Sequence, residues 1–288
     1  MDSLVQPTPA GAGVSAPLNS ANAGFIVHRT GQLEYAFAAE GRQFSAELVQ
    51  YLNRAQPDVL SASLFTEVAG VRDRVHWFVH LRSPHDYQRL LQMVDLDRDY
   101  QDISTRDRLP ARGGGNWERM FTAGSFAERV LCPQHGFGHP PEGAVDPAVL
   151  FADPACYQTT QPLELQLSTA DAGAVVLRTG KARYEHRDAA RQFAVAWADA
   201  LNAGAPGQVT AFLYEEIFGR QDTLHWLIHL RALDDYALLD ELGVGDPRLG
   251  EVLARRWVAA GGGGGWGELF VPGSLRDVAM VPHPRGAG

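Results

Sequence analysis

The sequence predicts an α+β protein that contains two copies of one βαββαβ unit. The first observation is an internal repeat, in which residues 19–135 recur at 168–284 without a gap. The motif Arg29-Thr30-Gly31, for example, lies 149 positions before Arg178-Thr179-Gly180. The second observation is that apolar residues alternate at period two in some segments of each copy and recur every three or four residues in others. A unit of this length is long enough to bury its own core.

The first strand and the first helix open each copy. Residues 25–29 form a short β-branched segment closed by Thr-Gly, which is typical of a strand followed by a turn. Further along, one apolar stripe recurs at the helical period and predicts an amphipathic helix. Its members are Phe44, Leu48, Tyr51, Leu52 and Ala55, with Phe193, Trp197, Ala200, Leu201 and Gly204 in the second copy.

A hairpin and a second helix come next. Residues 59–68 and 75–81 read as strands, and the Gly-containing loop between them is of a length that joins antiparallel neighbours. Ser83-Pro84 then supplies a helix N-cap and a first-turn proline, with Asp86 three residues after the cap. Further helical stretches are predicted over 97–109 and 246–258, and a last strand over 129–131.

The order strand, helix, strand, strand, helix, strand is that of the ferredoxin-like unit, whose helices cover only one face of an antiparallel sheet. With its duplication and its strand motif His-Trp-x-x-His-Leu, the chain resembles the dimeric α+β barrel superfamily. It also resembles an uncharacterised bacterial family linked to natural-product biosynthesis. The resemblance implies two sheets packed face to face around a cavity, as a pseudo-dimeric barrel within one chain.

Four segments are expected. Residues 1–18 read as a disordered tail, 19–135 as the first barrel repeat, 136–167 as a linker and 168–288 as the second repeat. The linker contains several X-Pro pairs. Within it, the alternation of residues 163–167 is typical of an edge strand.

Charge and composition exclude several classes of function. The chain has 25 basic and 34 acidic residues, a net charge of −9, and no basic run, which disfavours nucleic acid and anionic membranes as partners. No apolar run reaches the ~18 residues of a membrane span, and the N-terminus does not resemble a signal peptide. We therefore expect a cytoplasmic protein. Lys181, in a predicted turn, is the only lysine, and the two cysteines occupy non-equivalent positions of the repeat.

Histidines on the second strand of each hairpin are the candidate catalytic residues. Alternation places His76, Phe78 and His80 on one face and the bulky Trp77 on the other, which should lie under the helices. An imidazole in an apolar cavity is a candidate acid or base because its pKa lies close to neutrality. We predict catalytic roles for His76, His80, His225 and His229, with Phe78 and Leu227 contacting substrate.

Two other interpretations of these histidines stay open. Each ring could simply satisfy a buried polar group of the protein. A metal role is disfavoured because histidines four residues apart on a strand are separated by ~13 Å. No metal site is predicted.

Glutamates and tryptophans complete the predicted substrate site. Glu67 and Glu216 lie near the end of the strand that pairs with the histidine strand, where a carboxylate could orient an imidazole. Trp117 and Trp266 come directly after the glycine tracts and are predicted to close the mouth of each cavity. No dinucleotide, P-loop, hydrolase or zinc-protease motif occurs, so no cofactor is predicted.

The resemblance implies a small-molecule enzyme of specialised, antibiotic or polyketide-type metabolism. The cavity histidines would transfer a proton in cyclisation, isomerisation or cofactor-independent oxygenation of a hydrophobic substrate. Two alternatives remain: a non-catalytic protein that binds a hydrophobic metabolite, as in self-resistance, and a haem-binding barrel protein. The chain would act as a monomeric pseudo-dimer or as a homodimer.

Overall fold

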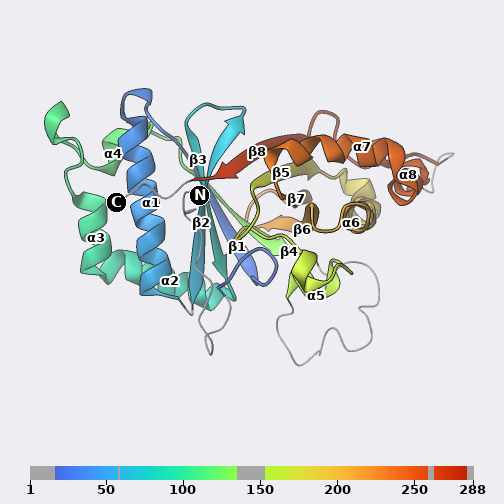
Figure 1. Ribbon diagram of the computed structural model, residues 1–288, viewed down its shortest axis with the longest axis horizontal. Coiled ribbons are helices and arrows are strands. Elements are labelled where there is room, and N and C mark those ends of the chain that lie inside the picture. Colours follow the sequence, from blue (N-terminus) through green and yellow to red (C-terminus); the bar gives the residue numbers. More distant parts are fainter. Residues whose placement is uncertain (1–16, 58, 135–152, 259–262, 284–288) are drawn as a thin grey trace. The chain divides into compact units, whose positions relative to one another are not determined.

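The computed structural model describes residues 17–57, 59–134, 153–258 and 263–283 (Figure 1). The disorder predicted for the N-terminal tail, and most of the predicted linker, lie outside these residues. The chain divides into two compact units, one around Phe25–Arg129 and the other around Val130–Ala279. Within the described residues, no helix has both the length and the apolar character that a membrane span requires.

The first unit is an antiparallel sheet with strand order β1-β3-β2. The central strand, β3, pairs with β1 on one side and with β2 on the other. Figure 1 shows the helices α1 to α4 on one side of this sheet. The elements are β1 (Phe25–Gln32), η1 (Tyr35–Phe37), α1 (Ala38–Ala55), β2 (Leu60–Ala69), β3 (Arg74–Leu81), α2 (Pro84–Leu96), α3 (Arg98–Thr105), η2 (Pro110–Arg112) and α4 (Trp117–Met120).

Local chemistry explains these elements. The apolar stripe of α1 buries Phe44, Val49 and Leu52. The β2–β3 turn ends at Asp73, whose φ of 60° is left-handed, a conformation that Asp tolerates better than most residues. At the start of α2, the backbone N–H of Ser83 donates to the Asp86 carboxylate at 3.1 Å, as in a capping box. The hydroxyl of Ser83 donates to the same carboxylate at 2.9 Å.

The second unit has strand order β5-β7-β6-β4. Its strand β7 again lies between two antiparallel neighbours, β5 and β6. The elements are β4 (Ala127–Pro133), α5 (Pro154–Tyr157), η3 (Leu163–Leu165), β5 (Ala174–Lys181), η4 (Tyr184–His186), α6 (Arg187–Gly204), β6 (Val209–Ile217), β7 (Thr223–Leu230), η5 (Leu233–Ala237), α7 (Leu238–Gly245), α8 (Pro247–Ala254), η6 (Trp266–Glu268) and β8 (Arg276–Pro282).

Each unit contains the end of the other repeat. In the second unit, Val130–Pro133 of β4 pair with Tyr214–Ile217 of β6, although β4 closes the first repeat. In the first unit, the N–H of His283 donates to the carbonyl of Leu64 in β2, at 2.9 Å. The units therefore do not coincide with the boundaries 19–135 and 168–288. The physical reason is that the edge strands β2 and β6 offer backbone groups that need hydrogen-bond partners.

The predicted edge strand at 163–167 is wrong. Leu163–Leu165 form a 3-10 turn, because the N–H of Leu165 donates back to the carbonyl of Pro162. The side chain of Gln158 forms hydrogen bonds with the edge of β6 instead. Its amide oxygen accepts from the N–H of Leu213 at 2.6 Å, and its amide nitrogen donates to the carbonyl of the same residue at 2.9 Å.

The predicted fold class is confirmed as α+β with antiparallel sheets. The helical stretches predicted over 97–109 and 246–258 are shorter than expected and end at Thr105 and Ala254. Face-to-face packing of the two sheets stays a prediction.

Candidate active site

The faces of the first sheet separate as the alternation predicts. On one face, Trp77 contacts the rings of Phe121 and Phe126, with centroids 5.9 and 6.1 Å apart. Phe121 in turn meets Phe44 of α1, so this is the face that the helices cover. Strand register places the following residues together on the opposite face: Ile26, His28, Thr30, Ser61, Ser63, Phe65, Glu67, His76, Phe78 and His80.

Three of these side chains form a hydrogen-bonded chain, which we call the His–His–Glu chain: His28, His76 and Glu67. Nε2 of His28 lies 3.0 Å from Nδ1 of His76. Nε2 of His76 lies 3.3 Å from Oε2 of Glu67. The side chains of His76 and Glu67 are only 3% and 4% exposed, and His28 is buried as well, so little water competes for these contacts.

The environment fixes the charges along this chain. Burial acts to raise the pKa of Glu67, but hydrogen bonds from His76 and from the N–H of Val71 outweigh it and lower that pKa below its ordinary value. Burial lowers the pKa of His76, partly offset by Glu67. At neutral pH, Glu67 is therefore ionised and His76 neutral.

These charges also set the tautomers. His76 donates from Nε2 to the carboxylate of Glu67, so its Nδ1 must accept a proton from Nε2 of His28. A neutral His28 then carries its lone pair on Nδ1. This is the nitrogen that can act as a base.

Aromatic rings surround the outer imidazole. The ring of Phe78 stacks on His28, with centroids 4.5 Å apart and planes 8° apart. Phe65 meets Phe78 edge to face at 5.6 Å. All three side chains are at most 1% exposed. This apolar environment disfavours a charged imidazole and suits an aromatic ligand.

The second unit keeps only part of this arrangement. Nε2 of His225 lies 3.4 Å from Oε2 of Glu216, which matches the first unit. However, the register of 149 residues puts Leu177 opposite His28. The Nδ1 of His225 instead lies 3.0 Å from the hydroxyl of Thr179. A hydroxyl in this place can share a hydrogen bond but is a much poorer base than an imidazole at neutral pH.

His229 is held on both ring nitrogens. Its Nδ1 lies 2.9 Å from the carbonyl of Thr210 and therefore carries the proton, while Nε2 accepts from the hydroxyl of Ser20 at 2.8 Å. The Ser20 oxygen also accepts from the N–H of Thr169, at 3.0 Å. Burial lowers the pKa of His229 to about 4. Its counterpart His80 lies 3.3 Å from the carbonyl of Ser61. These contacts fit the structural interpretation of both histidines.

The two predicted lid tryptophans lie on the helix side of their sheets. Trp117 stacks on Phe44 of α1, with centroids 6.3 Å apart. Trp266 stacks on Phe193 of α6, at 5.6 Å and 7°. In the first unit, this is the face opposite the histidines. These positions do not agree with the predicted lid over the histidine face, because large aromatic rings gain from stacking on the rings of α1 and α6.

Two of the described histidines have no ring nitrogen available to a haem iron. His76 and His229 use both ring nitrogens, so binding iron would break a hydrogen bond in each. Among the described residues, no group of three or more His, Cys, Asp or Glu side chains is arranged to hold a metal ion.

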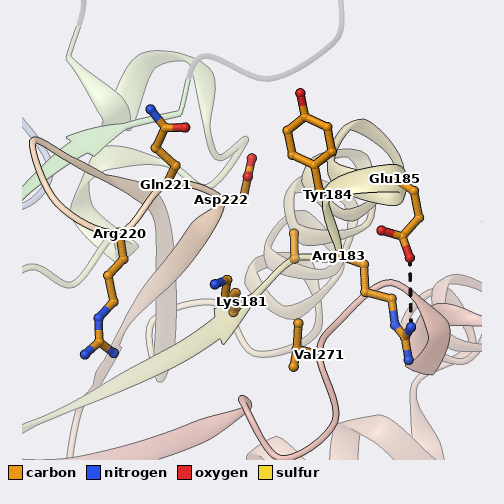
Figure 2. A pocket seen from close by; sticks show the side chains of 9 residues that line it. Lys181, Arg183, Tyr184, Glu185, Arg220, Gln221, Asp222 and Val271 are labelled. Atoms are coloured by element: carbon orange, nitrogen blue, oxygen red, sulfur yellow. Dashed lines mark ion pairs between the residues drawn. The ribbon is translucent and has the colours of Figure 1, made fainter.

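A separate pocket of about 530 Å³ opens in the second unit, where the end of β5 meets the β6–β7 turn (Figure 2). It contains none of the predicted site residues. Its lining comprises Lys181, Ala182, Arg183, Tyr184, Glu185, Arg220, Gln221, Asp222 and Val271.

Sequence reasoning missed His28, Thr179 and Ser20. A signal for His28 was present, because the repeat register places a histidine opposite Leu177 in an otherwise similar strand. The pairing of β1 with β3, which sets His28 directly opposite Phe78, was the information that the sequence lacked.

Solved structures with a similar fold include proteins described as putative monooxygenases. One is a putative monooxygenase from Fusobacterium nucleatum subsp. nucleatum, with a TM-score of 0.56, 6% identity and coverage of 91% of this chain and 93% of the other. Another, from Lactobacillus acidophilus, has a TM-score of 0.52, 8% identity and coverage of 90% and 94%. An anthrone oxidase-like protein reaches a TM-score of 0.48 at 11% identity, covering 94% and 96%. At such identities, the likeness concerns the fold alone.

The chain itself belongs to a family of unknown function, DUF6039, whose model matches residues 5–287. No curated protein matches it.

Proposed function

We propose that this protein is a small-molecule enzyme that removes a proton from an aromatic or polyketide-type substrate, using the His–His–Glu chain of the first unit. The observation that carries the proposal is the buried series of contacts from His28 through His76 to Glu67, of 3.0 and 3.3 Å. A buried carboxylate that holds an imidazole increases its basicity, as in many proton-transfer sites. The shared fold with putative monooxygenases agrees with an oxidative reaction.

The proton transfer balances along the chain. Nδ1 of His28 takes the substrate proton, and the proton on its Nε2 passes to Nδ1 of His76. The positive charge then rests on His76, where the ionised Glu67 stabilises it. The substrate is left as a carbanion, enolate or phenolate. That anion can cyclise or isomerise, or it can pass electrons to O₂ in a cofactor-independent oxygenation.

Only the first unit carries the complete chain. In the second unit, Leu177 takes the place of His28, and the hydroxyl of Thr179 occupies the Nδ1 side of His225. We therefore assign proton removal to the first repeat, with His225, Glu216 and Leu227 supporting the second sheet. His80 and His229 maintain buried structure.

Hydrogen–deuterium exchange tests proton removal alone, whether the resulting anion cyclises, isomerises or reacts with O₂. Anthrone, an aromatic ketone with an acidic CH₂, is incubated with the protein in D₂O under argon, and loss of the CH₂ signal is monitored by NMR. We expect the native protein to accelerate exchange. His28→Leu and His76→Gln should lose about 10²–10⁴-fold, the usual contribution of a general base. His225→Gln is the matched control and should retain exchange.

Full exchange in folded His28→Leu and His76→Gln variants would contradict the assignment. A second experiment addresses the binding-protein alternative. Ligands that co-purify with the protein are identified by mass spectrometry and incubated with it in air. A ligand that stays tightly bound and chemically unchanged would favour sequestration over catalysis. An intense Soret band in the same preparation would identify haem.

A further inference from the structure

The second unit contains a pocket that the proposed proton transfer does not use. We propose that this pocket, about 530 Å³ in volume, binds a small organic anion with a carboxylate or phosphate head group. The inference rests on the charges that line it and on the different net charge of the matching positions in the first repeat.

The acidic groups of the pocket are already paired. Glu185 lies 3.9 Å from Arg183, the contact drawn as a dashed line in Figure 2. Asp222 lies 3.5 Å from Arg191, which is anchored on Glu215 at 2.5 Å. These carboxylates therefore have cationic partners other than Lys181 and Arg220.

Two cations of the pocket remain available to a ligand. Lys181, the last residue of β5, and Arg220, in the β6–β7 turn, both line it and are both exposed. Among the residues that the structure describes, no carboxylate lies within ion-pair distance of either side chain. Two cations facing one concave surface attract an anion, and Arg can bind carboxylate or phosphate through two parallel hydrogen bonds.

The first repeat shows that this charge is not required by the fold. The same positions there hold Gln32 in place of Lys181 and Val71 in place of Arg220. Glu34 also takes the place of Arg183. The first repeat does carry an arginine in this turn, Arg72, in the position of Gln221, but it lies 3.5 Å from Asp73. Over all the positions that line the pocket, the formal charge is +1 in the second copy and −1 at the matching positions of the first. A difference confined to one copy suggests a ligand of that copy.

The volume points to an organic ligand rather than an inorganic ion. Ligand pockets of ~300–1,000 Å³ usually hold small organic molecules. Tyr184 and Val271 supply apolar surface on the side of the pocket away from Arg220 (Figure 2). An anion with a small ring or short chain would place its head group between Lys181 and Arg220 and its apolar part against Tyr184.

The single lysine gives a direct test. The protein is treated with limiting acetylating reagent, and acetylation of Lys181 is measured by mass spectrometry, with the N-terminal amine as internal reference. The probes are benzoate, phenyl phosphate, inorganic phosphate and neutral benzyl alcohol, all at constant ionic strength. At about three times Kd a probe fills about three quarters of the sites, so labelling of Lys181 should slow about fourfold.

We expect protection by benzoate, by phenyl phosphate or by both, and the difference between them identifies the preferred head group. Arg220→Gln should weaken protection about tenfold through the loss of a charge-assisted hydrogen bond. Arg248→Gln, an exposed α8 residue outside the pocket, makes the same change in net charge and should leave protection intact. The proposal is overturned if neither organic anion protects Lys181, if inorganic phosphate or benzyl alcohol protects equally, or if protection survives in Arg220→Gln.

Discussion

In the proposed mechanism, single side chains decide which half of the protein passes a proton. The two repeats share a histidine and a glutamate at matching positions, His76 with Glu67 and His225 with Glu216. They differ in the next residue along the chain of contacts, because an imidazole faces His76 and a threonine hydroxyl faces His225. In the proposed mechanism, the change from His28 to Leu177 at the matching position therefore decides whether a proton can pass between two imidazoles.

Removing the charge of Glu67 should alter the pH profile. Burial lowers the pKa of His76, and Glu67 partly offsets this effect. The substitution Glu67→Gln should therefore lower the pKa of His76 further. The acid limb of the exchange rate, where rate is lost as the imidazoles become protonated, should then move to lower pH. The plateau rate should fall about tenfold or more, because a less basic imidazole accepts the proton less well. The measurement is anthrone exchange from pH 4 to 8.

The matched control for that variant is Glu216→Gln in the second unit, which should leave both the plateau and the acid limb in place. An unchanged acid limb in Glu67→Gln would indicate that His76 is not the group that titrates.

His229 should make stability depend on pH. Burial lowers its pKa to about 4 in the folded protein, below the unfolded value of ~6.5. Below pH ~6.5, His229 binds a proton in the unfolded chain but not in the folded protein. The free energy of unfolding should therefore fall as the pH drops from ~6.5 to ~4. The loss approaches about 3 kcal/mol at ~1.4 kcal/mol per pKa unit. Urea unfolding at pH 7 and pH 4.5 measures it.

In His229→Gln, the contribution of His229 to the loss of stability between pH 7 and pH 4.5 should disappear. The variant should also be less stable than the native protein at pH 7. His85→Gln, on the exposed surface of α2, is the control and should keep the full pH dependence. Identical pH dependence in His229→Gln and the native protein would show that His229 is not the linked group.

On the helix-covered face of the first sheet, aromatic residues have a structural role. Trp117 precedes Phe121 by one helical turn, and both pack with Phe44 of α1 and with Phe126. These rings tie α1 and α4 to the helix-covered face of the sheet. Glycines before Trp117 let the chain reach this cluster, with left-handed φ angles of 86° and 76° at Gly113 and Gly114.

Trp117→Leu should therefore lower stability and leave catalysis nearly unchanged. Partial loss of this packing should cost about 1–3 kcal/mol, since the side chain is only half-buried. Thermal unfolding gives the stability, and anthrone exchange below the unfolding temperature gives the activity. A variant of native stability with strongly reduced exchange would restore the lid interpretation.

Elements with strong local signals were predicted well. The Ser83–Asp86 cap, the alternation of β3 and the stripe of α1 all depend on residues close in sequence. The short segment at 163–167 was misread because alternation over five residues also fits an irregular chain. The carbonyl of Pro162 accepts a hydrogen bond from Leu165 and closes a turn there, and the side chain of Gln158 forms hydrogen bonds with the edge of β6.

Across the whole molecule, each unit depends on chain from the other repeat. Val130–Pro133 pair in the second unit, and His283 bonds to Leu64 in the first. A fragment of residues 19–135 would expose the β2 edge and leave the second half of β4 without β6. We expect it to lack a cooperative unfolding transition in circular dichroism, whereas the full chain should show one.

The matched control is a protein cleaved at a protease site inserted after residue 145, which retains both parts. This nicked protein should unfold cooperatively, because all strand partners are present. A cooperative transition in the isolated fragment would show that the first repeat folds without strand exchange.

The duplication, the α+β class and the face on which His76 and His80 lie could all be predicted from the amino-acid order, because register and periodicity are properties of local chain order. The joining of His28 to His76, the packing of Trp117 under a helix and the pocket shared by Lys181 and Arg220 became known only from the folded chain. Those relations join residues that are distant in the sequence, and their distances depend on strand pairing and side-chain packing. No local pattern encodes them.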